Sequence, residues 1–171
     1  EGKAFAHEVL SFMRERLSDY QEETGRLFNL EATPAEGTSY RLAKLDKELY
    51  PNIITSGEKE PYYTNSTQLP VNHGWDLFTA LQHQDDLQTR YTGGTVFHAF
   101  LGEKVTDLST CEQVIRTAFS HFRLPYFSLT PTFSVCPEHG YLSGEQPVCP
   151  HCGADTEVWS RVVGYYRPVK N

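Results

Sequence analysis

The feature that most constrains this chain lies in its last forty residues, where two short turns read CPEHG and CPHCG. The first turn contributes Cys136 and His139, and the second contributes Cys149 and Cys152. In each turn a proline follows the first of these residues and a glycine follows the second. Glycine adopts positive φ readily, which lets backbone N–H groups turn toward a bound sulfur. Two ligand pairs on two tight turns indicate a zinc ribbon with one tetrahedral ion.

The fourth ligand of this predicted site is open to more than one interpretation. His139 stands where a zinc ribbon normally has a second cysteine. His151 is a competing candidate, although an ordinary turn of this kind points that position away from the metal, and a water molecule is a further alternative. The set we predict is Cys136, His139, Cys149 and Cys152. Because all four positions are then filled by protein groups, no position is left for a reacting water, and the sequence predicts a structural zinc ion. The competing interpretation is unpaired thiols beside a surface histidine.

Composition limits the class of protein. The chain has 171 residues, of which 39% are hydrophobic and 22% charged, the profile of a soluble globular protein with one domain or one domain and an appendage. No apolar run approaches the roughly 18 residues of a membrane span. The formal net charge is −7, whereas binding to nucleic acid needs a basic patch. We therefore predict neither a nucleic-acid partner nor a membrane partner.

Cysteine usage indicates a reducing environment. Three of the four cysteines belong to the predicted metal site, and Cys111 stands alone. This pattern argues against a disulfide framework and fits a reducing compartment, so we expect a cytoplasmic protein.

Helical and extended patterns alternate before the two turns, which is typical of βα units. A capping pattern at Thr33, Pro34 and Glu36 marks one helix start, and Ser109 or Thr110 is expected to cap another. The number of units is too small to close a barrel. A shift in composition near Thr130 divides the chain into a predicted α/β segment, residues 1–130, and a zinc module, residues 131–171. The predicted helices cover about residues 3–24, 33–50, 74–89 and 109–121, and the extended segments cover 27–32, 62–70 at its start, 96–100, 126–135 and 157–166.

Three loops are candidates for ligand binding, because α/β folds place ligands at the ends of strands and helices. The first, Thr33 to Ser39, is a helix start rich in hydroxyls that could hold an anion, or it forms an ordinary cap. Asn65, Ser66 and Thr67 offer hydrogen-bond donors to a phosphate or a sugar, or they form an ordinary turn. Gly93 and Gly94 allow the backbone to approach a ligand or another strand closely, or they form a plain β-turn.

No catalytic residue is assigned from the sequence. His98 sits in the middle of a predicted strand, where a packed histidine is favoured over a catalytic one. Cys111 follows a helix start, where a thiol pKa can fall, but no partner is evident and a packing role is favoured. The chain has no Ser-His-Asp pattern, no P-loop and no GxGxxG motif.

Five stretches in this order give the chain a specific resemblance. They read NLEATPAEGTSYRLAKLD, YYTNSTQLPVN, LQTRYTGGTVFHAFLGE, LPYFSLTPTFSVCPEHGYLSGEQPVCPHCG and RVVGYYRPVKN. From about residue 5 to its end, the chain resembles the C-terminal part of the anaerobic (class III) ribonucleoside-triphosphate reductases, a glycyl radical enzyme family. The resemblance implies the C-terminal part of a ten-stranded α/β barrel followed by a small zinc-ribbon module.

The same resemblance implies a function. The family reduces the 2′-hydroxyl of ribonucleoside triphosphates, which supplies deoxyribonucleotides for DNA replication. An activase that uses S-adenosylmethionine and an iron–sulfur cluster installs the glycyl radical, which passes to a cysteine inside the barrel. ATP and deoxynucleotides regulate the enzyme. Asn65, Ser66 and Thr67, with the Gly93–Gly94 turn, are then expected to line the substrate side of the barrel.

The chain departs from the family pattern in its zinc ligands and in its radical residues. The family's zinc site usually has four cysteines, whereas His139 stands at one position here. Gly164 belongs to the RVVGYY segment and is not the radical glycine, and Cys111 does not match the thiyl cysteine. We therefore expect both radical residues outside this chain, which should be inactive alone and should self-associate through an open sheet edge that includes Val96 and Phe97.

Two other functions compete with this interpretation. An independent zinc-ribbon module that binds a protein partner would explain the two turns but not the βα segment. A small metal-stabilised enzyme, complete in itself, would need a catalytic set that the sequence does not show.

Overall fold

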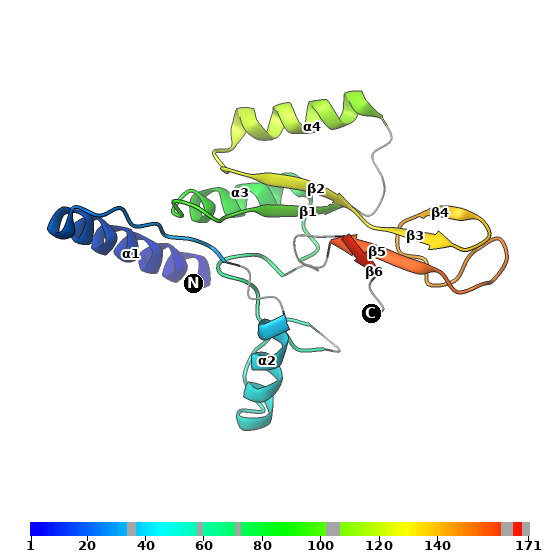
Figure 1. Cartoon of the computed structure of the whole chain (residues 1–171), viewed down its shortest axis with the longest axis horizontal. Helices are drawn as coiled ribbons and strands as arrows, with labels where there is room; N and C mark the ends of the chain where they lie inside the picture. The colour runs from blue at the N-terminus through cyan, green and yellow to red at the C-terminus, as the bar shows by residue number, and fades with distance from the viewer. Residues whose placement is uncertain (34–36, 58–59, 71–72, 102–106, 162–165, 169–171) are drawn as a thin grey trace. The chain divides into compact units, whose positions relative to one another are not determined.

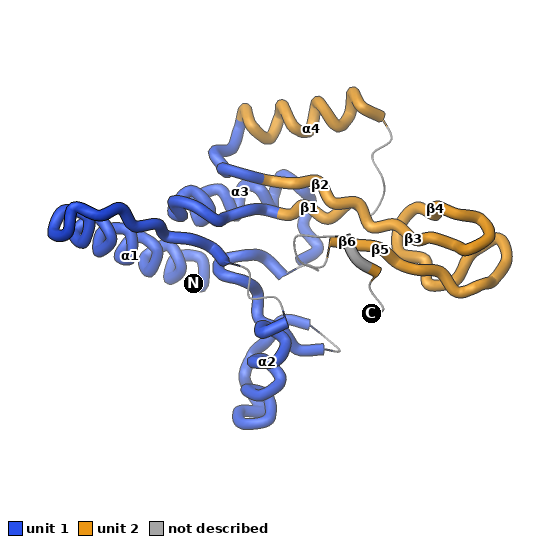
Figure 2. Tube along the Cα trace, viewed as in Figure 1, with its two compact units in different colours: residues 1–97, 121–126 blue, residues 98–120, 127–171 orange. Residues whose placement is uncertain are grey.

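The structure is a computed structural model that describes residues 1–33, 37–57, 60–70, 73–101, 107–161 and 166–168. It forms two compact units (Figure 2). Unit 1 contains residues 1–97 and 121–126, and unit 2 contains residues 98–120 and 127–171. The domain boundary predicted at residue 131 lies within unit 2 and stays a prediction.

The described residues of unit 1 contain three helices, all of which the sequence predicted to within a few residues (Figure 1). They are α1 (Gly2–Thr24), α2 (Gly37–Leu49) and α3 (Leu77–Gln88). Helix α1 ends at Gly25, which has φ of 66° and donates its N–H to the carbonyl of Gln21, a glycine stop of the αL type. Residues 34–36, which include most of the predicted capping box, lie outside the described residues.

The core of unit 1 forms where α1 packs against α3. Five buried side chains make one cluster: Leu10, Leu30, Ala32, Leu87 and Tyr91. The strand predicted over 27–32 is wrong for the described residues, because only Glu31 pairs there, in an isolated parallel bridge with Gly93. The start of 62–70 likewise contains only one antiparallel bridge, between Ser56 and Tyr62. Each segment thus pairs at a single bridge, and neither forms a ladder with its neighbour.

A βαβ arrangement makes up the first part of unit 2, apart from its end residues Phe97 and His121, which belong to unit 1. Strand β1 (Phe97–Leu101) and strand β2 (Phe127–Pro131) form a two-stranded sheet, and α4 (Leu108–His121) connects them along the chain. The N–H of Phe97 donates to Tyr126 at 3.0 Å, and the N–H of Thr132 donates to Leu101 at 3.2 Å. The first residues of β1 and β2 therefore lie side by side, and so do their last residues. The two strands run parallel, as the predicted βα alternation requires.

Helix α4 is capped by Asp107 and not by Ser109 or Thr110, which the sequence analysis proposed. The Asp107 carboxylate accepts hydrogen bonds from the backbone N–H of both residues, at 3.2 and 3.0 Å. Hydrogen bonds from Thr110 and then Ser109 hold the pKa of Asp107 well below its usual range. The aspartate prevails because its carboxylate has two acceptor oxygens, whereas each hydroxyl here donates to it.

The rest of unit 2 is a small antiparallel sheet. Its strands are β3 (Phe133–Cys136), β4 (Gly140–Ser143), β5 (Glu157–Arg161) and β6 (Tyr166–Pro168), in the order β4-β3-β5-β6. The single strand predicted over 157–166 is wrong, because Arg161 pairs with Tyr166 across an antiparallel ladder and the chain therefore reverses between them.

The described residues thus form a mixed α/β fold, and the barrel implied by the resemblance stays a prediction. None of the helices in the described part of the chain combines the length and the apolar character that crossing a membrane requires.

Candidate metal centre

Two tight turns of unit 2 hold the four predicted ligands. Cys136 is the last residue of β3 and pairs with Gly140, the first residue of β4, so His139 sits in the turn between the strands. The second turn is closed by hydrogen bonds from the N–H of Cys149 to Ala154 at 2.8 Å and from the N–H of Gly153 to Cys149 at 2.9 Å. Gly140 and Gly153 have φ of 70° and 74°, which confirms the positive φ predicted after each second ligand.

The ligand atoms of Cys136, His139, Cys149 and Cys152 all lie within 4.8 Å of one another. The Cys136 sulfur is 3.7 Å from the Cys152 sulfur and 3.7 Å from Nδ1 of His139. The Cys149 sulfur is also 3.7 Å from that nitrogen. Sulfurs at about 2.3 Å from a tetrahedral zinc are about 3.8 Å apart, so these residues fit a tetrahedral ion of that size.

His151, the competing ligand, lies beside this group rather than in it. Its ring packs against the ring of His139, with centroids 5.3 Å apart at an interplanar angle of 43°. The group therefore has three sulfurs and one imidazole nitrogen, the donor set of a Cys₃His zinc site.

The candidate centre has a buried side and an exposed side. Cys136 and Cys149 are 1% and 2% exposed and form a small core with Leu142. His139 and Cys152 are exposed. A sheet of this size buries little apolar surface, and domains this small usually rely on metals or disulfides for stability.

The pKa values of two thiols in the candidate centre are shifted in opposite directions. Burial raises the pKa of the Cys149 thiol, but hydrogen bonds from the backbone N–H groups of Cys152 and His151 outweigh it and leave the pKa lowered. A hydrogen bond from Ala154 lowers the pKa of Cys152, but burial and the nearby thiols of Cys149 and Cys136 raise it to about 11. A divalent cation among these sulfurs would supply the positive charge that lets all three ionise.

A hydrogen-bonded loop supports the second turn. The buried hydroxyl of Ser134 donates to the carbonyl of Gly144 and accepts from the N–H of Gln146, both at 2.9 Å. The hydroxyl of Thr156 donates to the carbonyl of Gln146. Since Ser134 belongs to β3, these contacts fix the segment that leads to Cys149 against the strand that ends at Cys136.

The predicted ligand loop of Asn65, Ser66 and Thr67 is a tight turn in unit 1. The carbonyl of Asn65 accepts from the N–H of Gln68 at 2.9 Å. Ser66 lies at the exposed tip of this turn and has φ of 48°, a left-handed conformation that is uncommon for residues other than glycine. The hydroxyl of Thr67 lies 3.1 Å from the hydroxyl of Tyr91.

The predicted ligand loop of Gly93 and Gly94 packs against another segment of the same unit. A Cβ atom on Gly94 would lie 3.1 Å from Cβ of Glu31, and the φ of Gly94 is 63°. The glycines therefore allow a neighbouring extended segment to approach, which is one of the alternatives that the sequence left open. A substrate role for Gly93 and Gly94 stays a prediction.

Sequence reasoning missed two residues that connect these loops. Gln84 and Gln88, on α3, are both fully buried. The amide of Gln84 donates to the carbonyl of Thr67 at 3.0 Å, and the hydroxyl of Thr95 donates to Gln88. The helical period could have found them, because both share the buried face of α3 with Leu81.

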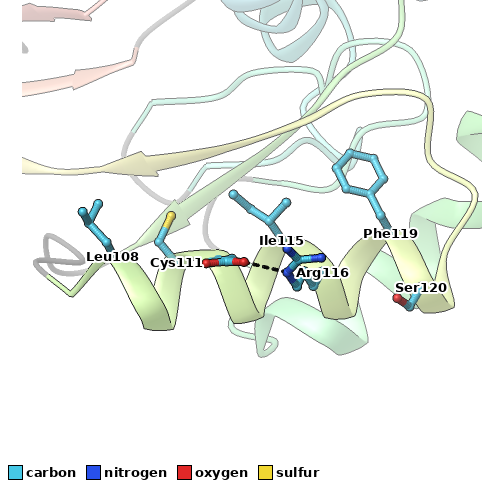
Figure 3. A pocket seen from close by; sticks show the side chains of 7 residues that line it. Leu108, Cys111, Ile115, Arg116, Phe119 and Ser120 are labelled. Carbon is cyan, nitrogen blue, oxygen red and sulfur yellow. Dashed lines mark hydrogen bonds and ion pairs between the residues drawn. The ribbon is translucent and has the colours of Figure 1, made fainter.

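His98 and Cys111 are both half-buried, and the packing role favoured for each stays a prediction. Nδ1 of His98 lies 2.7 Å from the hydroxyl of Ser128. Burial lowers the pKa of the His98 imidazole, and the positive charge of Arg161 lowers it further. Cys111 lines a hollow along α4, on the same side of the helix as Leu108, Ile115 and Phe119 (Figure 3).

The chain is similar in sequence to known proteins of one family. A family model described as anaerobic ribonucleoside-triphosphate reductase matches residues 1–170. The anaerobic ribonucleoside-triphosphate reductase of Enterobacteria phage T4 is 30% identical over 157 residues, which cover 89% of this chain and 26% of that protein. The chain thus spans about a quarter of the length of this curated relative.

Solved structures agree with the sequence match. The crystal structure of the anaerobic ribonucleotide reductase from Thermotoga maritima with MES in the active site has a TM-score of 0.71 and 29% identity, covering 99% of this chain and 27% of that one. The structure of the same enzyme in complex with dATP and CTP has a TM-score of 0.69 and 27% identity, with the same coverage of 99% and 27%. The chain belongs to the anaerobic ribonucleoside-triphosphate reductase family.

Proposed function

We propose that this chain forms part of an anaerobic ribonucleoside-triphosphate reductase, to which it contributes a structural zinc centre and part of the substrate-binding barrel. The observation that carries the proposal is the family match over residues 1–170. The match at a TM-score of 0.71 over 99% of the chain supports it, because it extends through the helical unit as well as the ribbon. An independent zinc-ribbon adaptor would account for the ribbon alone.

The zinc part of the proposal rests on the Cys₃His group. Cys136 and Cys149 would hold the ion from the buried side, and His139 and Cys152 from the exposed side. Zinc bound there would join β3, β4 and the second turn, which stabilises this small sheet. With four protein ligands in the group, its role is structural.

We expect about one zinc ion per chain in protein purified without added metal, because the ligand atoms already lie at tetrahedral spacing. Elemental analysis by plasma mass spectrometry would measure it. Less than about a tenth of an equivalent, under conditions where the protein is folded, would rule out the proposed centre.

The substrate part of the proposal assigns the turn at Asn65, Ser66 and Thr67, with the turn at Gly93 and Gly94, to ribonucleoside triphosphate binding. Its support is the polar, exposed turn tip at Ser66 and the related Thermotoga maritima enzyme, which was solved with CTP and dATP. The radical chemistry, a glycyl radical installed by an S-adenosylmethionine iron–sulfur activase, belongs in this proposal to parts of the enzyme outside these 171 residues.

The isolated chain should form no deoxynucleotide when activase, reductant and CTP are supplied without oxygen, whereas the full-length reductase that contains it should. Radical transfer needs a glycine and a cysteine that the family resemblance assigns elsewhere. Chromatographic detection of dCTP would show whether the isolated chain and the full-length reductase each form the product. Product above background from the isolated chain would overturn this division of the chemistry, and none from the activated full-length protein would overturn the proposed function.

We also expect the isolated chain to self-associate through the sheet edge that includes Val96 and Phe97, since β1 pairs with β2 alone among the strands of the described residues. The side chain of Phe97 is only 4% exposed and its N–H already donates to Tyr126, so a further strand would pair along the opposite edge of β1. Light scattering would test this, and a strictly monomeric chain would contradict it.

A further inference from the structure

A line of buried side chains in unit 1 joins the two loops that the proposed function assigns to substrate. It runs from Thr95, next to the Gly93–Gly94 turn, through Gln88 and Gln84 to Thr67. Gln84 and Gln88 are fully buried, and Thr95 is 8% exposed. Polar side chains this deeply buried are costly unless each hydrogen bond is made.

The carbonyl at one end fixes the direction of every hydrogen bond in this line. The backbone oxygen of Thr67 can only accept, so the group 3.0 Å from it must be the NH₂ of Gln84. The remaining oxygen of Gln84 then accepts from the NH₂ of Gln88, at 2.9 Å. The oxygen of Gln88 accepts in turn from the hydroxyl of Thr95. Each amide therefore donates toward the Thr67 loop.

Other contacts hold the Asn65–Thr67 turn in one place. The hydroxyl of Thr67 meets Tyr91, a core residue, at 3.1 Å. The side-chain amide of Gln68 donates to the carbonyl of Val96 at 2.6 Å. These bonds hold the left-handed residue Ser66, an uncommon conformation that persists where its surroundings determine it.

We propose that Gln84, Gln88 and Thr95 are positioning residues that set the Asn65–Thr67 turn for nucleotide binding. They do not touch the substrate themselves. They act by fixing the carbonyl of Thr67, and through it the exposed tip at Ser66, relative to the Gly93–Gly94 turn. The proposal rests on the proposed function, because it assumes that these turns meet the ribonucleoside triphosphate.

The test uses the full-length reductase with CTP as the probe. Gln84→Met keeps the length of the side chain but removes the donor to Thr67, so the turn loses its anchor. We expect KM for CTP to rise at least about fivefold while kcat stays within about twofold. Leu81→Val is the matched control, because Leu81 is equally buried on α3 and should change stability without changing KM.

A second pair of variants keeps the test valid if Gln84→Met does not fold. Thr95→Val removes the hydroxyl at the far end of the line at nearly constant volume, and Thr95→Ser retains it. We expect KM to rise about threefold in the first variant and to match the wild type in the second.

Unchanged KM in both Gln84→Met and Thr95→Val would overturn the positioning role, as would an equal rise in Leu81→Val. Asn65→Ala separates this failure from a failure of the proposed function. If Asn65→Ala impairs turnover and the buried variants do not, only the positioning role fails. If Asn65→Ala has no effect, the substrate assignment fails as well.

Discussion

Replacing Cys149 by serine should remove the zinc and unfold the ribbon of unit 2. Cys149 is 2% exposed and forms a buried cluster with Cys136 and Leu142. Binding of a structural zinc is worth about 10–16 kcal/mol in small zinc modules, which is comparable with the entire stability of a domain. Zinc content should fall from about one equivalent to less than about a tenth of one.

The structural consequence should be confined to the ribbon. Amide hydrogen exchange should become fast in β3, β4 and β5, whose pairing brings the two ligand turns together. Protection should persist in α1 and α3, because their core is formed by other residues, such as Leu10 and Leu87.

Cys111→Ser is the matched control for this experiment. Cys111 is the cysteine outside the metal group, on α4. Its replacement should leave both zinc content and exchange in the ribbon unchanged. Full zinc occupancy in Cys149→Ser, or equal zinc loss in Cys111→Ser, would contradict the ligand assignment.

Replacing Asn65 by alanine in the full-length reductase should lower kcat/KM for CTP by about 5- to 150-fold. This range corresponds to about 1–3 kcal/mol for one lost hydrogen bond to a polar group in a desolvated site. The expectation follows from the placement of Asn65 at the start of a turn that Thr67 and Gln68 anchor.

Two measurements accompany this variant. The glycyl radical yield, measured by electron paramagnetic resonance, should match the wild type, which would show that activation is intact. Asn52→Ala, at an exposed turn after α2, should leave turnover unchanged. Unaltered turnover in Asn65→Ala at both low and saturating CTP would refute the substrate assignment.

Local patterns in the sequence predicted the candidate metal centre well. The ligands lie within residues 136–152, so the spacing of each turn and the glycine after it determine most of the geometry. The choice between His139 and His151 needed coordinates, because it depends on which ring faces the sulfurs. The helices followed from apolar periodicity for the same local reason.

Features that depend on distant partners were predicted less well. Residues 27–32 are apolar and extended, but whether they form a strand depends on the segment around Gly93, which offers only one bridge. The buried line through Gln84 and Gln88 was missed, because glutamine is usually exposed and its partners, Thr67 and Thr95, come from two other segments.

The most direct test of the proposed centre is X-ray absorption at the zinc edge of the purified protein. Cys136, Cys149 and Cys152 with Nδ1 of His139 should give three sulfur neighbours at about 2.3 Å and one nitrogen neighbour at about 2.0 Å. His139→Ala should remove the nitrogen shell, whereas His151→Ala should leave it unchanged, because the ring of His151 packs beside His139. A zinc ion surrounded by oxygen, or a nitrogen shell that depends on His151, would contradict the Cys₃His centre.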